Sequence, residues 1–129
     1  MFENIDIFRM SSAMARHAGH RQAIVAQNVA NADTPDYHAR DVADFAASYT
    51  PADSADMQRA TRKQHLNGSL GGEVLPAIVE VRDQASPNGN QVSLETEILK
   101  SVDAKRQHDR ALAIYKTALS VLRTSMRTN

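Results

Sequence analysis

The sequence predicts a mainly α-helical protein, in which a long N-terminal helix and a long C-terminal helix pair as an antiparallel, coiled-coil-like hairpin. Apolar residues recur at helical spacing towards both ends of the 129-residue chain. All four prolines and four of the five glycines lie between these two segments. Aromatic residues make up only 5% of the chain and Trp is absent, so large side chains that usually anchor a globular core are scarce. We therefore expect an irregular middle insert, partly β or disordered.

The first helix is predicted over residues 6–31, with Asp6 as a residue suited to cap its start. Phe8, Val25 and Val29 fall near one side at helical spacing, together with several alanines. This stripe is narrow and rich in small residues. Such a stripe favours close packing against another helix over packing into a thick globular core.

The end of this helix carries a distinctive polar junction. Asn28 and Asn31 are three residues apart, so they share a helix face although Asn is a poor helix former. Thr34 and Pro35 then stop the helix, and Tyr37 follows. Two asparagines beside a proline turn indicate a specified junction rather than a nucleophile or a metal site.

The middle of the chain gives weaker signals. Residues 47–72 are assigned no fold, because they are polar and contain a glycine-rich run. Residues 74–81 have strand composition, although Pro76 limits the first half to an edge or irregular strand. Residues 86–90, with the sequence SPNGN, are predicted to form a turn.

The C-terminal helix is predicted over residues 92–127, with Ser93 at its start. Its stripe at three-four spacing is apolar at both ends and polar in the centre: Leu94, Ile98, Ser101, Lys105, His108, Leu112, Tyr115, Leu119, Leu122 and Met126. Across the two helices we expect an apolar seam formed by Phe8, Val25, Val29, Ile98, Leu112, Tyr115, Leu119 and Leu122.

These signals divide the chain into residues 1–45, a middle region of residues 46–91, and residues 92–129. The terminal helices are expected to form one axial domain. Two helices cannot cover both of their apolar stripes against water, so we expect other chains to supply the missing surface.

Other classes of function have little support in the sequence. The net charge of zero gives no general attraction to nucleic acid or anionic lipid. The absence of Cys excludes disulfides and thiolate chemistry. His17 and His20 lie three apart, but no further ligand completes a metal site. We identify no catalytic, cofactor-binding or metal-binding residues. No segment has the length of a membrane span, and residues 1–6 lack the pattern of a cleavable signal peptide.

Two motifs resemble the flagellar basal-body rod and hook proteins. Residues 28–45, NVANADTPDYHARDVADF, resemble the family's N-terminal signature, and their second half is similar to its proximal-rod members. Residues 88–97, NGNQVSLETE, resemble the turn before the family's last helix. Asp36 stands where the signature usually has Gly. A type II turn there would require a positive φ, which Asp adopts less readily than Gly.

The resemblance implies a structural subunit of the proximal rod, which assembles helically and transmits motor torque. The implied partners are copies of itself, other proximal rod proteins, a basal rod adaptor and the flagellar export apparatus. The implied location is the periplasmic rod, reached without a cleaved signal. Asn28, Asn31, Thr34, Pro35 and Tyr37 would fix the chain's exit from the first helix and its contact with a neighbour. The alternatives are a soluble helical adaptor that binds one partner helix and, with little support, a metal enzyme using His17 and His20.

Overall fold

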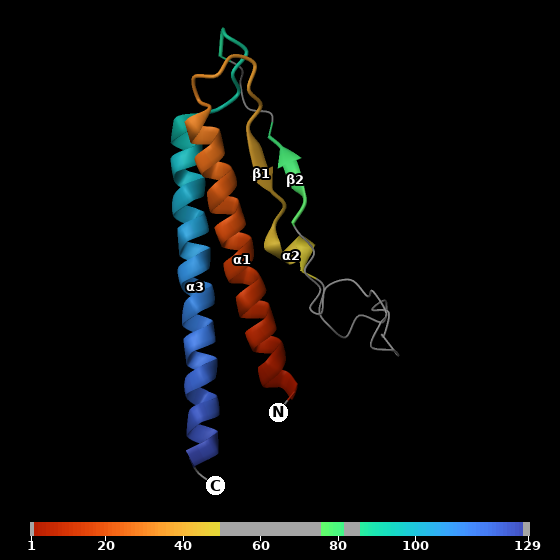
Figure 1. Cartoon of the computed structure of the whole chain (residues 1–129), viewed down its shortest axis with the longest axis vertical. Helices are drawn as coiled ribbons and strands as arrows, with labels where there is room; N and C mark the ends of the chain where they lie inside the picture. Colours follow the sequence, from red (N-terminus) through yellow and green to blue (C-terminus); the bar gives the residue numbers. More distant parts are fainter. Residues whose placement is uncertain (1, 50–75, 82–85, 128–129) are drawn as a thin grey trace, which may run out of the picture.

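Two long helices lie side by side and antiparallel in the computed structural model, which describes residues 2–49, 76–81 and 86–127 (Figure 1). Helix α1 comprises Phe2–Ala30 and helix α3 comprises Leu94–Arg127. Both chain ends lie at the same end of this pair, and the loops that follow α1 and precede α3 lie at the other (Figure 1). The predicted mainly α fold with a long helical hairpin is confirmed.

The start of α1 differs from the prediction. The helix begins at Phe2, so Asp6 lies inside it and does not cap it. No Pro or Gly precedes Asp6, so nothing in the sequence interrupts the helix there. The start of α3 is as predicted, because the N–H of Thr96 donates to the hydroxyl of Ser93 (3.4 Å) directly before Leu94.

Mostly small residues form the buried face of the helix pair, with Val25 and Glu97 as larger exceptions. Residues seven apart on each helix are at most 2% exposed: Ser11, Ala18 and Val25 on α1, and Glu97, Ala104 and Ala111 on α3. A spacing of seven residues keeps one face of a helix against its partner, and small side chains let the two backbones approach closely. The core of the molecule is therefore this narrow, alanine-rich face.

Contacts along the pair fix its register. Near the loops, the amide of Gln22 donates to the hydroxyl of Ser101 (3.0 Å). Near the chain ends, the rings of Phe8 and Tyr115 meet edge to face, with centroids 5.1 Å apart. The residue numbers of the two pairs have the same sum, as expected for two antiparallel helices in one continuous register.

A short β pair lies beside α1. Strand β1 (Arg40–Val42) is antiparallel to β2 (Ile78–Glu80), with Asp41 opposite Val79, and the four-residue helix α2 (Phe45–Ser48) follows β1. Strand β2 is the second half of the predicted strand. The sequence analysis did not predict β1. Residues 50–75, which include most of the unassigned middle region, lie outside the described residues.

Candidate assembly junction

Asn28 is the centre of the site, and it is completely buried. Its Nδ2 donates to the carbonyl of Arg40 (2.6 Å) and to Oε2 of Glu97 (2.9 Å). Its Oδ1 accepts from the N–H of Arg40 (3.1 Å) and from the hydroxyl of Tyr37 (3.3 Å). An amide side chain has two donor hydrogens and two acceptor lone pairs, and all four are used.

The contact with Arg40 explains why an amide is suited to this position. The antiparallel register pairs Arg40 with Glu80. The N–H of Val81 donates to the carbonyl of Ala39 (2.9 Å), so the backbone groups of Arg40 point away from β2 and towards α1. Asn28 bonds both of these groups, as a neighbouring strand would. It thereby attaches the β pair to α1.

The remaining signature residues form the turn after α1. The amide of Asn31 donates to the carbonyl of Gln27 (2.8 Å), and its oxygen accepts from the hydroxyl of Thr34 (3.2 Å). Pro35 and Asp36 occupy the two central positions of a turn closed by the N–H of Tyr37 on the carbonyl of Thr34 (3.4 Å).

Asp36 adopts the conformation that the family's usual Gly would favour. Its φ is 57°, in the left-handed region, as a type II turn requires at this position. Gly89 also has a positive φ, of 80°, and a Cβ at Gly89 would overlap the carboxylate of Asp36. The positive φ of Gly89 therefore favours glycine at this position, and any larger residue would also displace the carboxylate of Asp36.

Asn90 joins the second motif to the first, although residues 88–97 are about sixty positions further along the chain. It is 2% exposed. Its Nδ2 donates to the carbonyls of Asn31 (2.9 Å) and Thr34 (2.6 Å), and its Oδ1 accepts from the N–H of Val92 (2.7 Å). Carbonyls just beyond the end of α1 thus gain the partners that a helix end otherwise lacks.

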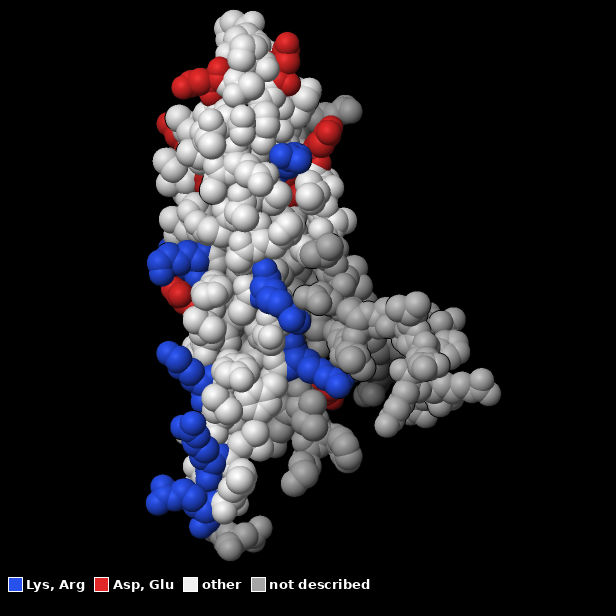
Figure 2. All heavy atoms as spheres, in the orientation of Figure 1, with Lys and Arg blue, Asp and Glu red and all other residues white. Residues whose placement is uncertain are grey.

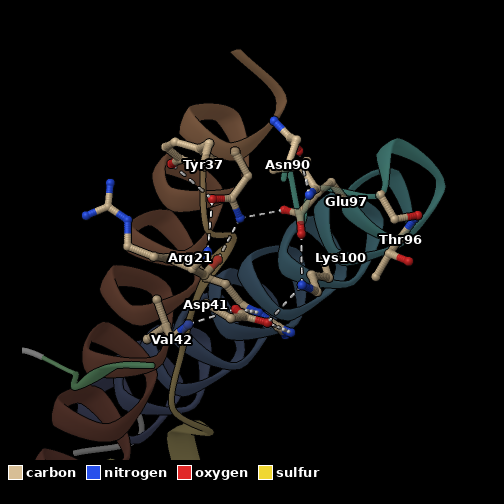
Figure 3. A network of polar contacts seen from close by, with 12 residues as sticks. Arg21, Tyr37, Asp41, Val42, Asn90, Thr96, Glu97 and Lys100 are labelled. Atoms are coloured by element: carbon tan, nitrogen blue, oxygen red, sulfur yellow. Dashed lines mark hydrogen bonds and ion pairs between the residues drawn. The ribbon is translucent and has the colours of Figure 1, made fainter. Parts of the chain in front are cut away.

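Two cations and two anions complete the junction (Figure 3). Arg21 of α1 binds Asp41 of β1 through two hydrogen bonds, of 2.9 and 3.1 Å. Lys100 of α3 binds Oε1 of Glu97 (2.8 Å) and lies 3.8 Å from Asp41. Glu97 is completely buried, and it therefore needs the donors supplied by Asn28 and Lys100. The network ties α1, β1 and α3 together.

The environment of Asp41 changes its pKa. Burial alone would raise it, but the hydrogen bonds from Arg21 and from the N–H of Val42, with the charges of Arg21 and Lys100, outweigh that effect. The pKa of Asp41 is therefore lowered. The hydrogen bond to Asp41 correspondingly raises the pKa of Arg21 against the opposing effect of burial.

The predicted seam residues are distributed over two surfaces. Val25 is 2% exposed, and Phe8, Leu119 and Leu122 are half-buried. Other predicted seam residues are substantially exposed in the single chain: Val29 (43%), Ile98 (59%), Leu112 (40%) and Tyr115 (40%). The three-four stripe predicted on α3 is thus not the buried face of the pair. Contact between these residues and neighbouring subunits stays a prediction.

His17 is buried in the fold and makes contacts that stabilise it. It is 6% exposed, its Nε2 donates to the carbonyl of Ala43 (2.7 Å), and its ring meets the edge of Phe45. Within the described ranges, no group of three or more His, Cys, Asp or Glu side chains is arranged to hold a metal ion. No helix in these ranges is apolar over the length needed to cross a membrane.

Comparison with known proteins identifies the family. The chain is 33% identical over 120 residues to the flagellar basal body rod protein FlgB of Agrobacterium fabrum, covering 88% of this chain and 87% of the relative. The chain belongs to the FlgB family. FlgB of Cereibacter sphaeroides is 30% identical over 109 residues, with 83% of each chain covered. FlgB of Escherichia coli K12 is 33% identical over 104 residues, with 72% of each covered. A scan of protein-family models gave no match.

FlgB membership confirms the resemblance identified in the sequence and does not favour the adaptor alternative. The sequence analysis did not select Arg21, Asp41, Asn90, Glu97 or Lys100. A seven-residue spacing was the available signal, since Arg21 is seven before Asn28 and Glu97 is seven before Ala104. Residues at the same heptad position share a helix face, so Glu97 belongs to the alanine face that is buried.

Proposed function

We propose that this structural subunit of the flagellar basal-body rod lies in the proximal rod, where it assembles helically with other rod proteins and transmits motor torque. The family relatives support the rod itself. The partners of this subunit would be further copies of this chain, other proximal rod proteins, a basal rod adaptor and the export apparatus. The rod location would be periplasmic, reached by export without a cleaved signal.

The observation that carries the assembly mechanism is the exposed apolar surface of the helix pair. Within one chain, the helices bury mainly small residues and leave Val29, Ile98 and Leu112 between 40% and 59% exposed. Burial of apolar surface contributes about 25 cal/mol for each Å² removed from water. Neighbouring subunits would gain this contribution by covering the exposed side chains, and contacts that do not close into a ring produce a helical array.

The junction would set the geometry of that surface. Asn28 fixes β1 and α3 relative to α1, and the turn through Pro35 and Tyr37 directs the chain out of the first helix. In this account the terminal helices of residues 1–45 and 92–129 form one axial domain. The middle region of residues 46–91 separates these two segments in the sequence. Torque would pass through the helix pair because its register is fixed by buried polar contacts.

Replacement of Asn31 tests the role of the signature in assembly. Among the described residues, the side chain of Asn31 forms its hydrogen bonds within its own turn, with Gln27 and Thr34, so its loss should leave the subunit folded. We expect Asn31→Ala to reduce recovery of the protein in purified basal bodies, and motility with it, more than it reduces soluble protein. Gln107→Ala, in the middle of α3, is the matched control. Normal incorporation of the Asn31 variant would contradict the assigned role.

A further inference from the structure

Asn88 and Gly89 form a chemically labile pair in the turn before α3. Glycine has no side chain to hinder approach, so its backbone nitrogen can attack the side-chain Cγ of the preceding asparagine. The attack closes a five-membered succinimide ring, and the side-chain nitrogen leaves with the proton of the glycine N–H as ammonia. Water then opens the ring at one of its two carbonyls. The product is either aspartate or isoaspartate, in which the backbone runs through the former side chain.

The folded turn holds both of the reacting groups. The N–H of Gly89 donates to the carbonyl of Ser86 (2.8 Å), so Pro87 and Asn88 occupy the central positions of a turn. Oδ1 of Asn88 accepts from the N–H of Asn90 (3.1 Å). The nucleophile and the amide that it would attack are therefore each engaged in a different hydrogen bond.

The backbone conformation also opposes closure of the ring. The φ of Asn88 is not positive, so the turn is of type I rather than type II, with ψ of about 0° at its third residue. This ψ places the nitrogen of Gly89 alongside the backbone nitrogen of Asn88 and away from its Cβ, whereas the succinimide ring contains both atoms. The carbonyl of Asn88 accepts from the N–H of Asp36 (3.3 Å), which resists rotation of this peptide group.

The charges around the turn act in the same direction. The attacking nitrogen must lose its proton, and nearby negative charge makes that loss less favourable. The carboxylate of Asp36 lies so close to Gly89 that a Cβ there would overlap it. Asp33 and Glu95 are also exposed at this end of the molecule, and Figure 2 shows acidic side chains gathered at this end of the visible face. Local charge therefore adds to the protection of Asn88.

We propose that Asn88 is a deamidation site that the folded junction protects, so that the reaction occurs in chains that have not folded. The protection does not depend on the rod function proposed above. It follows from contacts within one chain, between the turn of residues 86–90 and the turn that follows α1.

The isoaspartate product is incompatible with the junction. Asn90 is 2% exposed, and its Nδ2 bonds the carbonyls of Asn31 and Thr34. Isoaspartate at residue 88 lengthens the backbone directly before these contacts, so Asn90 no longer reaches both carbonyls. Aspartate at residue 88 keeps the normal backbone and an acceptor for the N–H of Asn90. A chain that stays unfolded for too long thus loses the ability to form the junction, whereas a folded chain is preserved.

Peptide mapping by mass spectrometry tests the protection. The full-length chain is kept at mildly alkaline pH, either native or in guanidinium chloride, and conversion of Asn88 to a carboxylic acid is followed by its change in mass. We expect conversion to be at least about tenfold slower in the native chain, as for a turn that reacts only when it opens. Residues 67 and 68, a second Asn-Gly pair outside the described residues, provide a reference rate in denaturant. Equal rates for Asn88 in the two states would overturn the proposal, and so would no conversion in denaturant while Asn67 reacts.

Asn90→Ala tests whether the junction is the source of the protection. It removes two hydrogen bonds to the turn after α1 and leaves the reacting pair unchanged, so the native variant should convert Asn88 about tenfold faster than the unaltered chain. Circular dichroism checks that the helices of the variant remain. Gln107→Ala, in the middle of α3, is the control and should not change the rate. No acceleration in the Asn90 variant, or the same acceleration in the control, would contradict protection by the junction.

Refolding of the aged chain tests the consequence of the reaction. After partial conversion in denaturant, the chain is diluted into buffer, and size-exclusion chromatography separates folded from expanded molecules. Isoaspartate at residue 88, labelled by isoaspartate methyltransferase and located by peptide mapping, should be depleted at least about tenfold from the folded fraction. Asn88→Asp carries the new charge without the longer backbone, so it should refold as the unaltered chain does. Equal amounts of isoaspartate in both fractions, or failure of the Asp variant to refold, would overturn the inferred effect on the junction.

Discussion

The junction half and the terminal half of the helix pair are held by different chemistry. In the junction half, Asn28, Asn90 and Glu97 are almost completely buried, and every side-chain N and O atom of the three forms at least one hydrogen bond. In the terminal half, the buried residues are small, such as Ser11 and Ala111, and the larger contact is the edge-to-face pair of Phe8 and Tyr115. The two halves share one helix register, but the contacts within a single chain hold the junction half more firmly than the terminal half.

This difference indicates that the two halves of the helix pair have different structural roles. Buried polar groups are costly unless their partners are correctly placed, so they favour one arrangement of α1, β1 and α3 over its alternatives. Small residues allow close packing but contribute little apolar area of their own. We infer that the junction half defines the subunit, while the terminal half gains much of its stability from neighbours.

Loss of the buried carboxylate should have the largest effect on this contrast. Glu97→Ala leaves Lys100 without its closest anion and removes one partner of Asn28, so we expect unfolding to become easier by about 3 kcal/mol. Glu97→Gln keeps the size of the side chain and should cost less. The measurement is urea unfolding followed by circular dichroism. A loss below about 1 kcal/mol for the Ala variant would show that the network does not stabilise the subunit.

The two signature asparagines should differ from each other. Asn28→Ala removes four hydrogen bonds at a buried position, with an expected cost of about 2–3 kcal/mol. Asn31→Ala removes local contacts in a more exposed turn and should cost less than about 1 kcal/mol. The same unfolding measurement on both variants compares them directly. Equal losses in the free energy of unfolding would mean that the greater burial of Asn28 does not make it more important for stability than Asn31.

The terminal half can be probed with two adjacent residues of α3. Ala111→Leu inserts a large side chain into the close helix contact and should cost about 1–3 kcal/mol. Leu112→Ala truncates a side chain that is 40% exposed, so it should change the unfolding of the isolated chain much less. Its main expected effect is on recovery in basal bodies. Unfolding losses in the reverse order would show that the buried face has been wrongly identified.

Acid should weaken the junction half before the terminal half. The pKa of Asp41 is lowered in the folded chain, so its contribution is fully present above its ordinary value, near 3.9, and is lost as the pH falls below that. Asp41→Asn should lower stability at neutral pH and make it less dependent on pH below about 4. Stability curves at pH 7 and pH 3 for both proteins provide the comparison. An unchanged acid dependence in the variant would assign the effect to other carboxylates.

Much of the fold could be predicted because its main signals are local. The helical spacing near both ends, the stop at Pro35 and the cap at Ser93 each depend on a few neighbouring residues. The β pair could not be predicted in the same way. Strand β1 has three residues, and Arg40 is held by Asn28 rather than by a pattern of its own.

The site could be predicted only in part, because several of its residues are brought together by contacts between distant parts of the chain. Asn28 and the turn through Pro35 could be identified because two asparagines close to a proline are unusual at the end of a helix. The sequence analysis includes Glu97 only as the last residue of the motif of residues 88–97, because its buried position depends on the rotation of α3 against α1. The apolar side chains of α3 suggested a different rotation, in which Ile98 faces α1, whereas the buried face contains Ala104 and Ala111. Close approach of the helices favours the smaller residues.

Hydrogen exchange on the isolated chain and on purified basal bodies tests the central account most directly. The account predicts that amides in residues 20–30 and 96–106 are protected in the isolated chain, because the junction network holds them. Amides in residues 6–14 and 110–122 should exchange much faster there and gain protection only in the assembled rod. Equal protection of both halves in the isolated chain, with no gain on assembly, would contradict the division between a self-defined junction and an assembly-dependent terminal half.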